Sequence, residues 1–172
     1  MKEKLFLLIF ILTINILNAQ VFEGKVIKVK DGDTIVVMDS EYQKFTIRIA
    51  DIDCPEKSQP FGNKAKRFVL DEIGGEMVNV EIKSHDRYGR AIGNIFYNNT
   101  NLSVELLKNG LAWHYKEYSK NKFYQRLEDN ARLNKIGLFI DTNAIRPSVY
   151  RKSKKKKKTK TLFQTIEDLL FK

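Results

Sequence analysis

Cysteine is almost absent from the sequence, since Cys54 is the only one among 172 residues, and there are only two histidines, His85 and His114. A lone cysteine cannot form an internal disulfide, so the fold must depend on its hydrophobic core. The usual zinc sites need several Cys and His ligands, and this composition argues against one. Internal repeats are also lacking. The length suits one domain with a sizeable core.

Long apolar runs are lacking too, because none reaches the roughly 20 residues of a membrane-spanning helix. The longest lies near the N-terminus, where Lys2 and Lys4 precede an apolar stretch over 5–17 and the short sequence LNA. This pattern is typical of a secretory signal peptide over residues 1–19. It predicts an exported protein, secreted or periplasmic, without stable membrane insertion after cleavage. An uncleaved membrane anchor is the alternative.

The net charge of +10 is unevenly distributed along the chain. Residues 151–160 (RKSKKKKKTK) hold eight Lys and Arg, and outside this run and residues 1–19 there are 21 basic and 20 acidic residues. The folded part is therefore nearly neutral. A run of like charges without apolar residues predicts a disordered tail. Such a tail is either simply solvated or contacts a polyanion such as nucleic acid.

A short apolar pattern follows the lysine run at residues 161–172. Thr161 and Gln164 resemble a capping box, and an apolar stripe follows it at Leu162, Ile166, Leu169 and Leu170. This indicates a short amphipathic helix that could bind a partner. A frayed end is the alternative, because isolated helices shorter than about 12 to 15 residues are marginal. The predicted organisation is thus a signal peptide (1–19), a folded domain (20–150) and a tail (151–172).

The pattern of the predicted domain indicates strands followed by helices. Strand-like segments cover residues 21–30, 34–38, 45–50, 77–82 and 91–97. Helical patterns cover residues 62–73, 102–108 and about 121–135, each followed by glycine. Five short strands with a helix between the third and fourth favour a small closed barrel, because closure removes exposed sheet edges.

Three carboxylates and two arginines lie near the predicted strand ends. Asp33, Asp53 and Glu56 offer oxygen ligands, which suit a hard cation such as Ca²⁺. Strand alternation places Arg48 on the face opposite the core, and Arg48 and Arg90 can each bind two phosphate oxygens. Together these groups suit a phosphodiester hydrolase. Each alone also has an ordinary explanation, such as a hairpin turn, a surface strand residue or a helix start.

Three motifs together resemble the staphylococcal nuclease family. They are Asp31-Gly32-Asp33-Thr34, then Arg48 five residues before Asp53-Cys54-Pro55-Glu56, and then Asp86-Arg87-Tyr88-Gly89-Arg90. Gly110-Leu111-Ala112-Trp113 and Gly137-Leu138-Phe139 are similar to the helical half of the family. The resemblance covers about residues 21–150. It implies an α+β fold, mainly β, with a five-stranded Greek-key OB-fold barrel and about three packed helices.

The resemblance also implies a role for each matching residue. Arg48 and Arg90 would hold the scissile phosphate, and Glu56 would act as the general base. Asp33 and Asp53 would bind Ca²⁺ together with the backbone carbonyl of Cys54, where the family usually has Thr. The expected nucleotide contacts are Arg87, Tyr88, Tyr115 and Tyr118.

The implied function is that of a secreted Ca²⁺-dependent endonuclease. By resemblance it would cleave single-stranded or denatured DNA and RNA, leave 3′-phosphate ends and act as a monomer. The alternative is an OB-fold module that binds nucleic acid or another polyanion without cleaving it. Loss of Asp33, Arg48, Glu56 or Arg90 would mark such a module, and all four are present.

Overall fold

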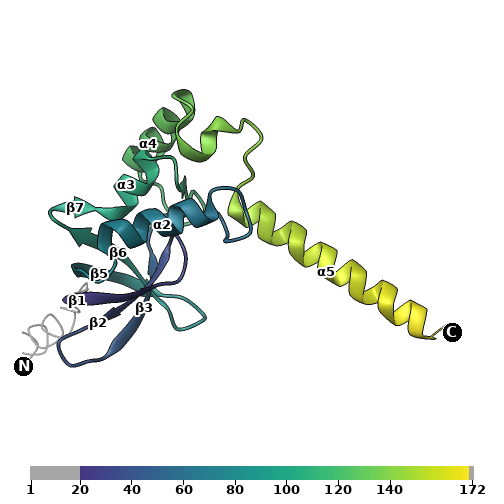
Figure 1. The fold of residues 1–172 in the computed structure, drawn as a ribbon, viewed down its shortest axis with the longest axis horizontal. Helices are drawn as coiled ribbons and strands as arrows, with labels where there is room; N and C mark the ends of the chain where they lie inside the picture. Colours follow the sequence, from purple (N-terminus) through teal and green to yellow (C-terminus); the bar gives the residue numbers. More distant parts are fainter. Residues whose placement is uncertain (1–19, 171–172) are drawn as a thin grey trace, which may run out of the picture.

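The main structural unit is a closed β-barrel (Figure 1). The computed structural model describes residues 20–170. Six strands form one sheet in the order β3-β2-β1-β5-β6-β7. Parallel pairing of β3 with β6 closes it, and every other pairing in this sheet is antiparallel. The predicted five-stranded barrel is confirmed, with β1 (Gln20–Val29), β2 (Thr34–Met38), β3 (Lys44–Ile49), β5 (Met77–His85) and β6 (Ala91–Tyr97); β7 (Thr100–Asn101) is a short addition.

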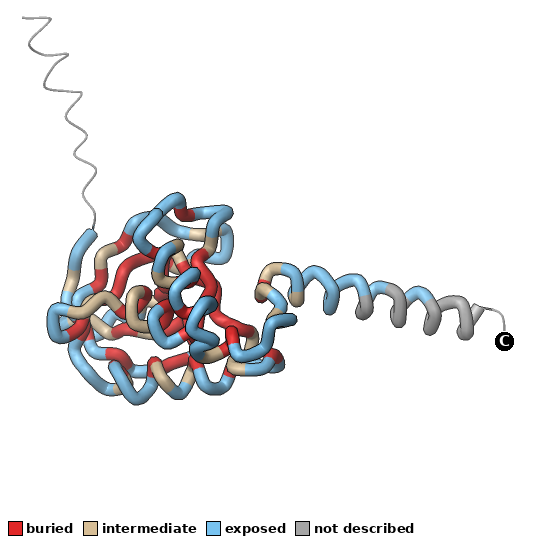
Figure 2. The backbone as a smooth tube through the Cα atoms, turned by 90° about the horizontal axis from the view of Figure 1, so that it is seen from above, coloured by how far each residue is buried: buried red, intermediate tan, exposed pale blue. Residues whose placement is uncertain are grey.

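The barrel interior is filled by apolar side chains that alternate with outward-facing residues along the strands. The least exposed are branched aliphatic residues, including Ile35, Val37, Ile47, Val80 and Ile95, each with no exposed surface. Figure 2 shows the buried segments gathered in the globular part of the chain. Because the single cysteine forms no disulfide, this core carries the fold.

Three α-helices and a short 3₁₀ helix accompany the barrel. In α2 (Gly62–Ile73), Ala65, Val69 and Ile73 recur on one face and are fully buried. In α3 (Leu102–Lys108) and α4 (Lys122–Leu133), the Asn before the helix accepts hydrogen bonds from two amides of the first turn. The 3₁₀ helix η1 (Gly137–Ile140) follows α4, and the prediction of about three packed helices is confirmed.

The tail differs from its prediction. Residues 151–160 were expected to be disordered, with a separate short helix from Thr161, but one helix, α5 (Pro147–Leu170), covers both segments and projects from the body (Figure 1). Lysine is a good helix former, and like-charge pairs along a helix cost only tenths of a kcal/mol each. Pro147 at the first position has the backbone angle that a helix start requires.

The N-terminal prediction cannot be compared with the structure, because the predicted signal peptide at residues 1–19 lies outside the described residues. Within residues 20–170, none of the helices combines the length and the apolar character needed to cross a bilayer.

Candidate active site

The candidate site is built around Arg48, which lies on the outer face of β3. Its Nη2 atom lies 3.1 Å from Asp33 Oδ2 and 3.1 Å from Asp53 Oδ1. Its Nη1 atom donates to the carbonyl of Ile49 at 2.8 Å. All three charged side chains are largely buried, with exposed fractions of 13% for Arg48, 11% for Asp33 and 4% for Asp53. One guanidinium thus brings two carboxylates that lie 20 residues apart to one point.

The turn before β2 holds Asp33 in this position. Gly32 is required there because a Cβ atom would lie 2.8 Å from the Ala65 Cβ and 2.9 Å from the Cys54 Cβ. The amide of Cys54 donates to Asp33 Oδ2 at 2.8 Å, and the Cys54 thiol lies 3.2 Å from the Gly32 carbonyl. The glycine therefore permits a close approach that fixes the carboxylate, and the thiol of Cys54 points to the backbone.

A bend after β3 brings Asp53 back to Arg48. Asp51 has a positive φ of 66°, which is uncommon outside glycine and reverses the chain over a short distance. The short strand β4 (Ile52–Asp53) then pairs with β8 (Trp113–His114), with Asp53 opposite Trp113. A buried carboxylate, Glu128 of α4, accepts the amide of His114 at 2.8 Å and holds β8. The barrel and the helical half therefore position Asp53 together.

Glu56 joins the cluster through an arginine that the sequence had not indicated. Arg151 of α5 donates from Nη1 to Glu56 Oε1 at 2.8 Å and from Nη2 to Asp53 Oδ2 at 3.0 Å. Its Nη1 also lies 3.2 Å from Asp53 Oδ1. The predicted base and a predicted metal ligand are thus connected by one guanidinium. In the sequence, Arg151 appears only as the first residue of the basic run, so nothing there separates it from the lysines.

Arg90 lies on the same face of the barrel as Arg48 but has another partner. Parallel pairing sets Arg48 opposite Ile92, so Arg90 precedes that position by two residues and points to the same side. Its Nε donates to Asp86 Oδ2 at 2.7 Å. Asp86 Oδ1 in turn accepts the amides of Tyr88 and Arg90, which closes the loop. No contact joins Arg90 to Asp33 or Asp53 among the described residues.

The aromatic residues predicted to contact nucleotide fall into two groups. Tyr88 is 70% exposed at the tip of the Asp86 loop and accepts a hydrogen bond from Arg87 at 2.7 Å. Tyr115 and Tyr118 pack edge to face, with ring centroids 4.8 Å apart. Tyr115 lies on the Asp53 side of the molecule, and the two groups come from separate loops.

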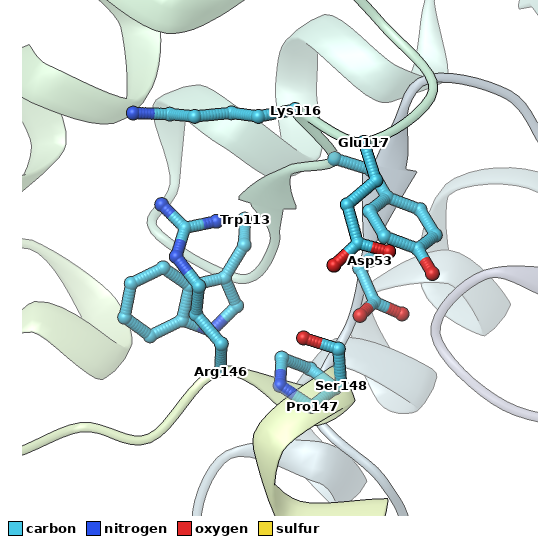
Figure 3. Close-up of a pocket in the computed structure, with 8 residues that line it drawn as sticks. Asp53, Trp113, Lys116, Glu117, Arg146, Pro147 and Ser148 are labelled. Atoms are coloured by element: carbon cyan, nitrogen blue, oxygen red, sulfur yellow. The ribbon is translucent and has the colours of Figure 1, made fainter.

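A pocket of about 200 Å³ adjoins Asp53, as Figure 3 shows. Its wall includes the ring of Trp113, with the Arg146 guanidinium 4.6 Å from the ring centroid. The start of α5 forms another part of the wall at Pro147 and Ser148. Tyr115, Lys116 and Glu117 complete the lining. An aromatic and cationic pocket beside the carboxylates has the chemistry to receive a nucleotide base or sugar.

The site electrostatics reflect several acids crowded together. Burial raises the pKa of Asp53, although hydrogen bonds from Arg151 and the charge of Arg48 oppose this. Burial and the neighbouring charge of Asp33 raise the pKa of Asp31 to about 6. Burial lowers the pKa of Arg48, but Asp33 and Asp53 outweigh it and raise the value overall. Burial also raises the pKa of the Cys54 thiol, so the thiol stays protonated.

The donor atoms fit a hard divalent cation. Asp33 and Asp53 present carboxylate oxygens that both reach the same nitrogen of Arg48, and Ca²⁺ prefers oxygen ligands of this kind. Within residues 20–170, no three Asp, Glu, His or Cys side chains are arranged to hold an ion by themselves. A cation at this position would therefore complete its coordination with backbone carbonyls, water or a phosphate oxygen.

Comparison with known proteins identifies the family. A model of the staphylococcal nuclease homologue family matches residues 46–141, which is more than half of the chain. The chain belongs to the staphylococcal nuclease family. An uncharacterized endonuclease of Haemophilus influenzae is 38% identical over 131 residues, covering 76% of this chain and 74% of that protein. This family membership agrees with the closed OB-fold barrel.

Two further relatives are nucleases by name. A micrococcal nuclease of Shigella flexneri is 35% identical over 145 residues, covering 78% of this chain and 83% of that protein. The staphylococcal-like nuclease CAN1 of Arabidopsis thaliana is 37% identical over 113 residues, or 66% of this chain. The match spans about a third of that plant protein, 35% of its length.

Proposed function

We propose that this member of the staphylococcal nuclease family is a Ca²⁺-dependent endonuclease that cleaves single-stranded DNA and RNA and leaves 3′-phosphate ends. The observation that carries the proposal is the convergence of Asp33 and Asp53 on Nη2 of Arg48, at 3.1 Å each. Glu56 is joined to the same cluster through Arg151. Nuclease-named relatives support the nuclease activity, and the oxygen donors support Ca²⁺.

The reaction is the in-line attack of water on phosphorus with departure of the 5′ oxygen. Negative charge grows on the equatorial phosphate oxygens, so groups that bind them more tightly in the transition state accelerate the reaction. Arg48 is held in place by its backbone and carboxylate contacts and presents a permanent positive charge there. Arg90, which directly precedes β6, would contact the same phosphate once its guanidinium leaves Asp86.

Glu56 and the bound cation have separate tasks. Glu56 orients or deprotonates the attacking water, a contribution worth roughly 10²- to 10⁴-fold in rate for a general base. Its side chain is 39% exposed, so water can reach it. Asp33 and Asp53 would hold the Ca²⁺ ion, which when bound supplies Lewis acidity to a phosphoryl oxygen.

Substrate binding is proposed to use the two aromatic groups and α5. The pocket at Asp53 and Trp113 accepts a base or sugar, while Arg87, Tyr88, Tyr115 and Tyr118 contact neighbouring nucleotides. The eight basic residues of 151–160 add sequence-independent attraction to phosphate groups. We also propose that the signal peptide at residues 1–19 directs export and that the protein acts as a monomer.

The test incubates purified protein with denatured DNA and with RNA, in Ca²⁺ or in chelator. We expect cleavage in Ca²⁺ and none in chelator. Products with 3′-phosphate ends cannot be extended by a polymerase until a phosphatase has removed the phosphate, which identifies the ends. An Arg48→Ala preparation purified in parallel controls for contaminating nucleases. Undiminished cleavage in chelator would contradict the assignment of Asp33 and Asp53.

The second candidate function is an OB-fold module that binds nucleic acid without cleaving it. The near-neutral barrel with a basic helix at one end is the observation that favours it. Binding of long single strands at full occupancy, without cleavage in Ca²⁺, would support this candidate instead.

A further inference from the structure

Arg151 lies across the acids that the proposed reaction needs. Its planar guanidinium spans both oxygens of Asp53, at 3.2 and 3.0 Å, and reaches Glu56 at 2.8 Å. Such a two-pronged contact is the strongest geometry between an arginine and a carboxylate. Both Asp53 oxygens and one Glu56 oxygen are therefore occupied by a cation from the chain itself.

A divalent cation and Arg151 would use the same oxygen atoms. Arg48 also donates to Asp53 Oδ1, so the two arginines together take three of the roughly four lone-pair sites of this carboxylate. A doubly charged ion a few ångströms from the guanidinium would repel it strongly. The two occupants therefore exclude each other at Asp53. The Arg151 side chain is 43% exposed, so its ion pair is of modest strength and can be displaced.

The rest of α5 is attached by a few polar contacts to one loop. The Tyr150 hydroxyl lies 3.2 Å from the Ser58 carbonyl and 3.1 Å from its hydroxyl, and Lys154 donates to the same hydroxyl at 2.8 Å. Ser58 lies in the loop that carries Glu56. Beyond this first part, α5 points away from the body (Figure 1). Pro147 is buried at the start of α5, but Val149, next to these contacts, is 54% exposed.

We propose that Arg151 is an intramolecular latch, which occupies the carboxylate cluster in the free protein and must withdraw before a divalent cation binds. This inference rests on the proposed function. The latch lies at the start of the helix that carries the lysine run, so a nucleic acid strand bound to those lysines competes for the same helix. Substrate and cation would thus favour the released state together, because each binds it better than the latched one.

The test compares Arg151→Gln with the unaltered protein by calorimetric titration with Ca²⁺ alone. Removing the competing guanidinium should tighten Ca²⁺ binding roughly three- to tenfold, the range of a partly exposed ion pair. Lys152→Gln is the matched control, because it removes one positive charge from the next residue of the same helix and Lys152 is exposed. Its affinity for Ca²⁺ should stay within about twofold of the unaltered protein.

A second measurement does not depend on metal or activity. Amide hydrogen exchange over residues 149–155, in chelator, should be faster in Arg151→Gln than in the unaltered protein and unchanged in Lys152→Gln. If neither protein binds Ca²⁺, the proposed function fails, while loss of protection in Arg151→Gln still supports the latch. Equal protection in both proteins, or equal or weaker Ca²⁺ binding by Arg151→Gln, would overturn the latch.

Discussion

Arg48 has two anionic partners before any substrate arrives. Its contacts with Asp33 and Asp53 keep two carboxylates close together that would otherwise repel each other. The donation to the Ile49 carbonyl fixes the plane of the guanidinium. Under the proposed function the same guanidinium would hold the metal ligands in position and bind the phosphate, and both tasks would depend on its planar geometry as well as on its charge.

The first prediction is that Arg48→Lys lowers turnover by on the order of 10²-fold or more. Lysine keeps the positive charge but cannot reach Asp33, Asp53 and Ile49 at once. Turnover is measured on single-stranded DNA in saturating Ca²⁺, and cooperative thermal unfolding shows that the fold is intact. Arg67→Lys in α2 is the control, since Arg67 is 73% exposed and its one ion pair within residues 20–170 is with Asp71. A near-normal rate for Arg48→Lys would assign Arg48 to the structure alone.

The second prediction concerns Arg90, whose proposed role in holding the phosphate rests on the family resemblance. Arg90→Lys should also lower turnover by on the order of 10²-fold, because a single ammonium cannot bind two phosphate oxygens in the plane of a guanidinium. Asp86→Asn should have a smaller effect, since it loosens the loop but leaves Arg90 intact. Steady-state rates for the two variants separate these effects. If Asp86→Asn is the more damaging change, Arg90 supports the loop instead.

At the residue scale, the sequence indicated the acids and arginines of the compact site but missed Arg151. Spacing places Arg48 on an outward face, and turn motifs place Asp33 at a strand start, so both could be predicted. Arg151 contacts Asp53 from 98 positions along the chain, and local patterns carry no information about such a contact. The residues that follow it are Lys152, Ser153 and a run of lysines, so the sequence analysis assigned Arg151 to the tail.

At the scale of elements, the structure of α5 differs most from the prediction made from the sequence. Helix α2 and the barrel strands follow from strong periodicity and were predicted to within a few residues. The run 151–160 has no apolar periodicity, so only charge repulsion was available for the prediction. The high helix propensity of lysine and the anchor at Tyr150 and Arg151 favour the helix instead.

The third prediction is that the lysines of α5 supply most of the salt-dependent affinity for nucleic acid. Replacing the lysines at 152, 154–158 and 160 by Gln, with Arg151 kept, leaves a chain of good helix formers without that charge. The log–log salt slope on long single-stranded DNA should fall by up to about 0.7 per lysine engaged. The rate on a dinucleotide substrate should be unchanged. Equal slopes for the two proteins would show that α5 is only a solvated appendage.

At the scale of the whole molecule, the site forms only when the barrel and the helical half are assembled. Asp33 and Arg48 belong to the barrel, while Asp53 is held by pairing with Trp113 and through it by Glu128 of α4. A closed barrel was predicted from the strand count, but not which strands close it, and the strands β4 and β8 are too short to give a pattern. Cation binding should therefore be linked to global stability.

The fourth prediction is that Ca²⁺ raises the midpoint of thermal unfolding. A ligand that binds only the folded state stabilises it by about 2.7 kcal/mol at 100 times its dissociation constant. For a chain of this size that corresponds to a shift of roughly 5 to 10 °C. Scanning calorimetry with Ca²⁺ and with chelator measures the shift, and Asp53→Asn should abolish most of it. An equal midpoint in both conditions would place any Ca²⁺ elsewhere.

The lysines of α5 that would bind nucleic acid lie at a distance along the helix from the carboxylates that would take part in cleavage. The lysine run ends at Lys160, the fourteenth residue of α5, which lies about 20 Å from the start of the helix at 1.5 Å per residue. Because the helix begins beside Asp53, a strand held at Lys160 must extend over several nucleotides to reach the carboxylates. Short fragments cannot contact the outer lysines and the carboxylates at once. The protein would thus lose hold of its products as they shorten, while long chains stay tethered for repeated cuts.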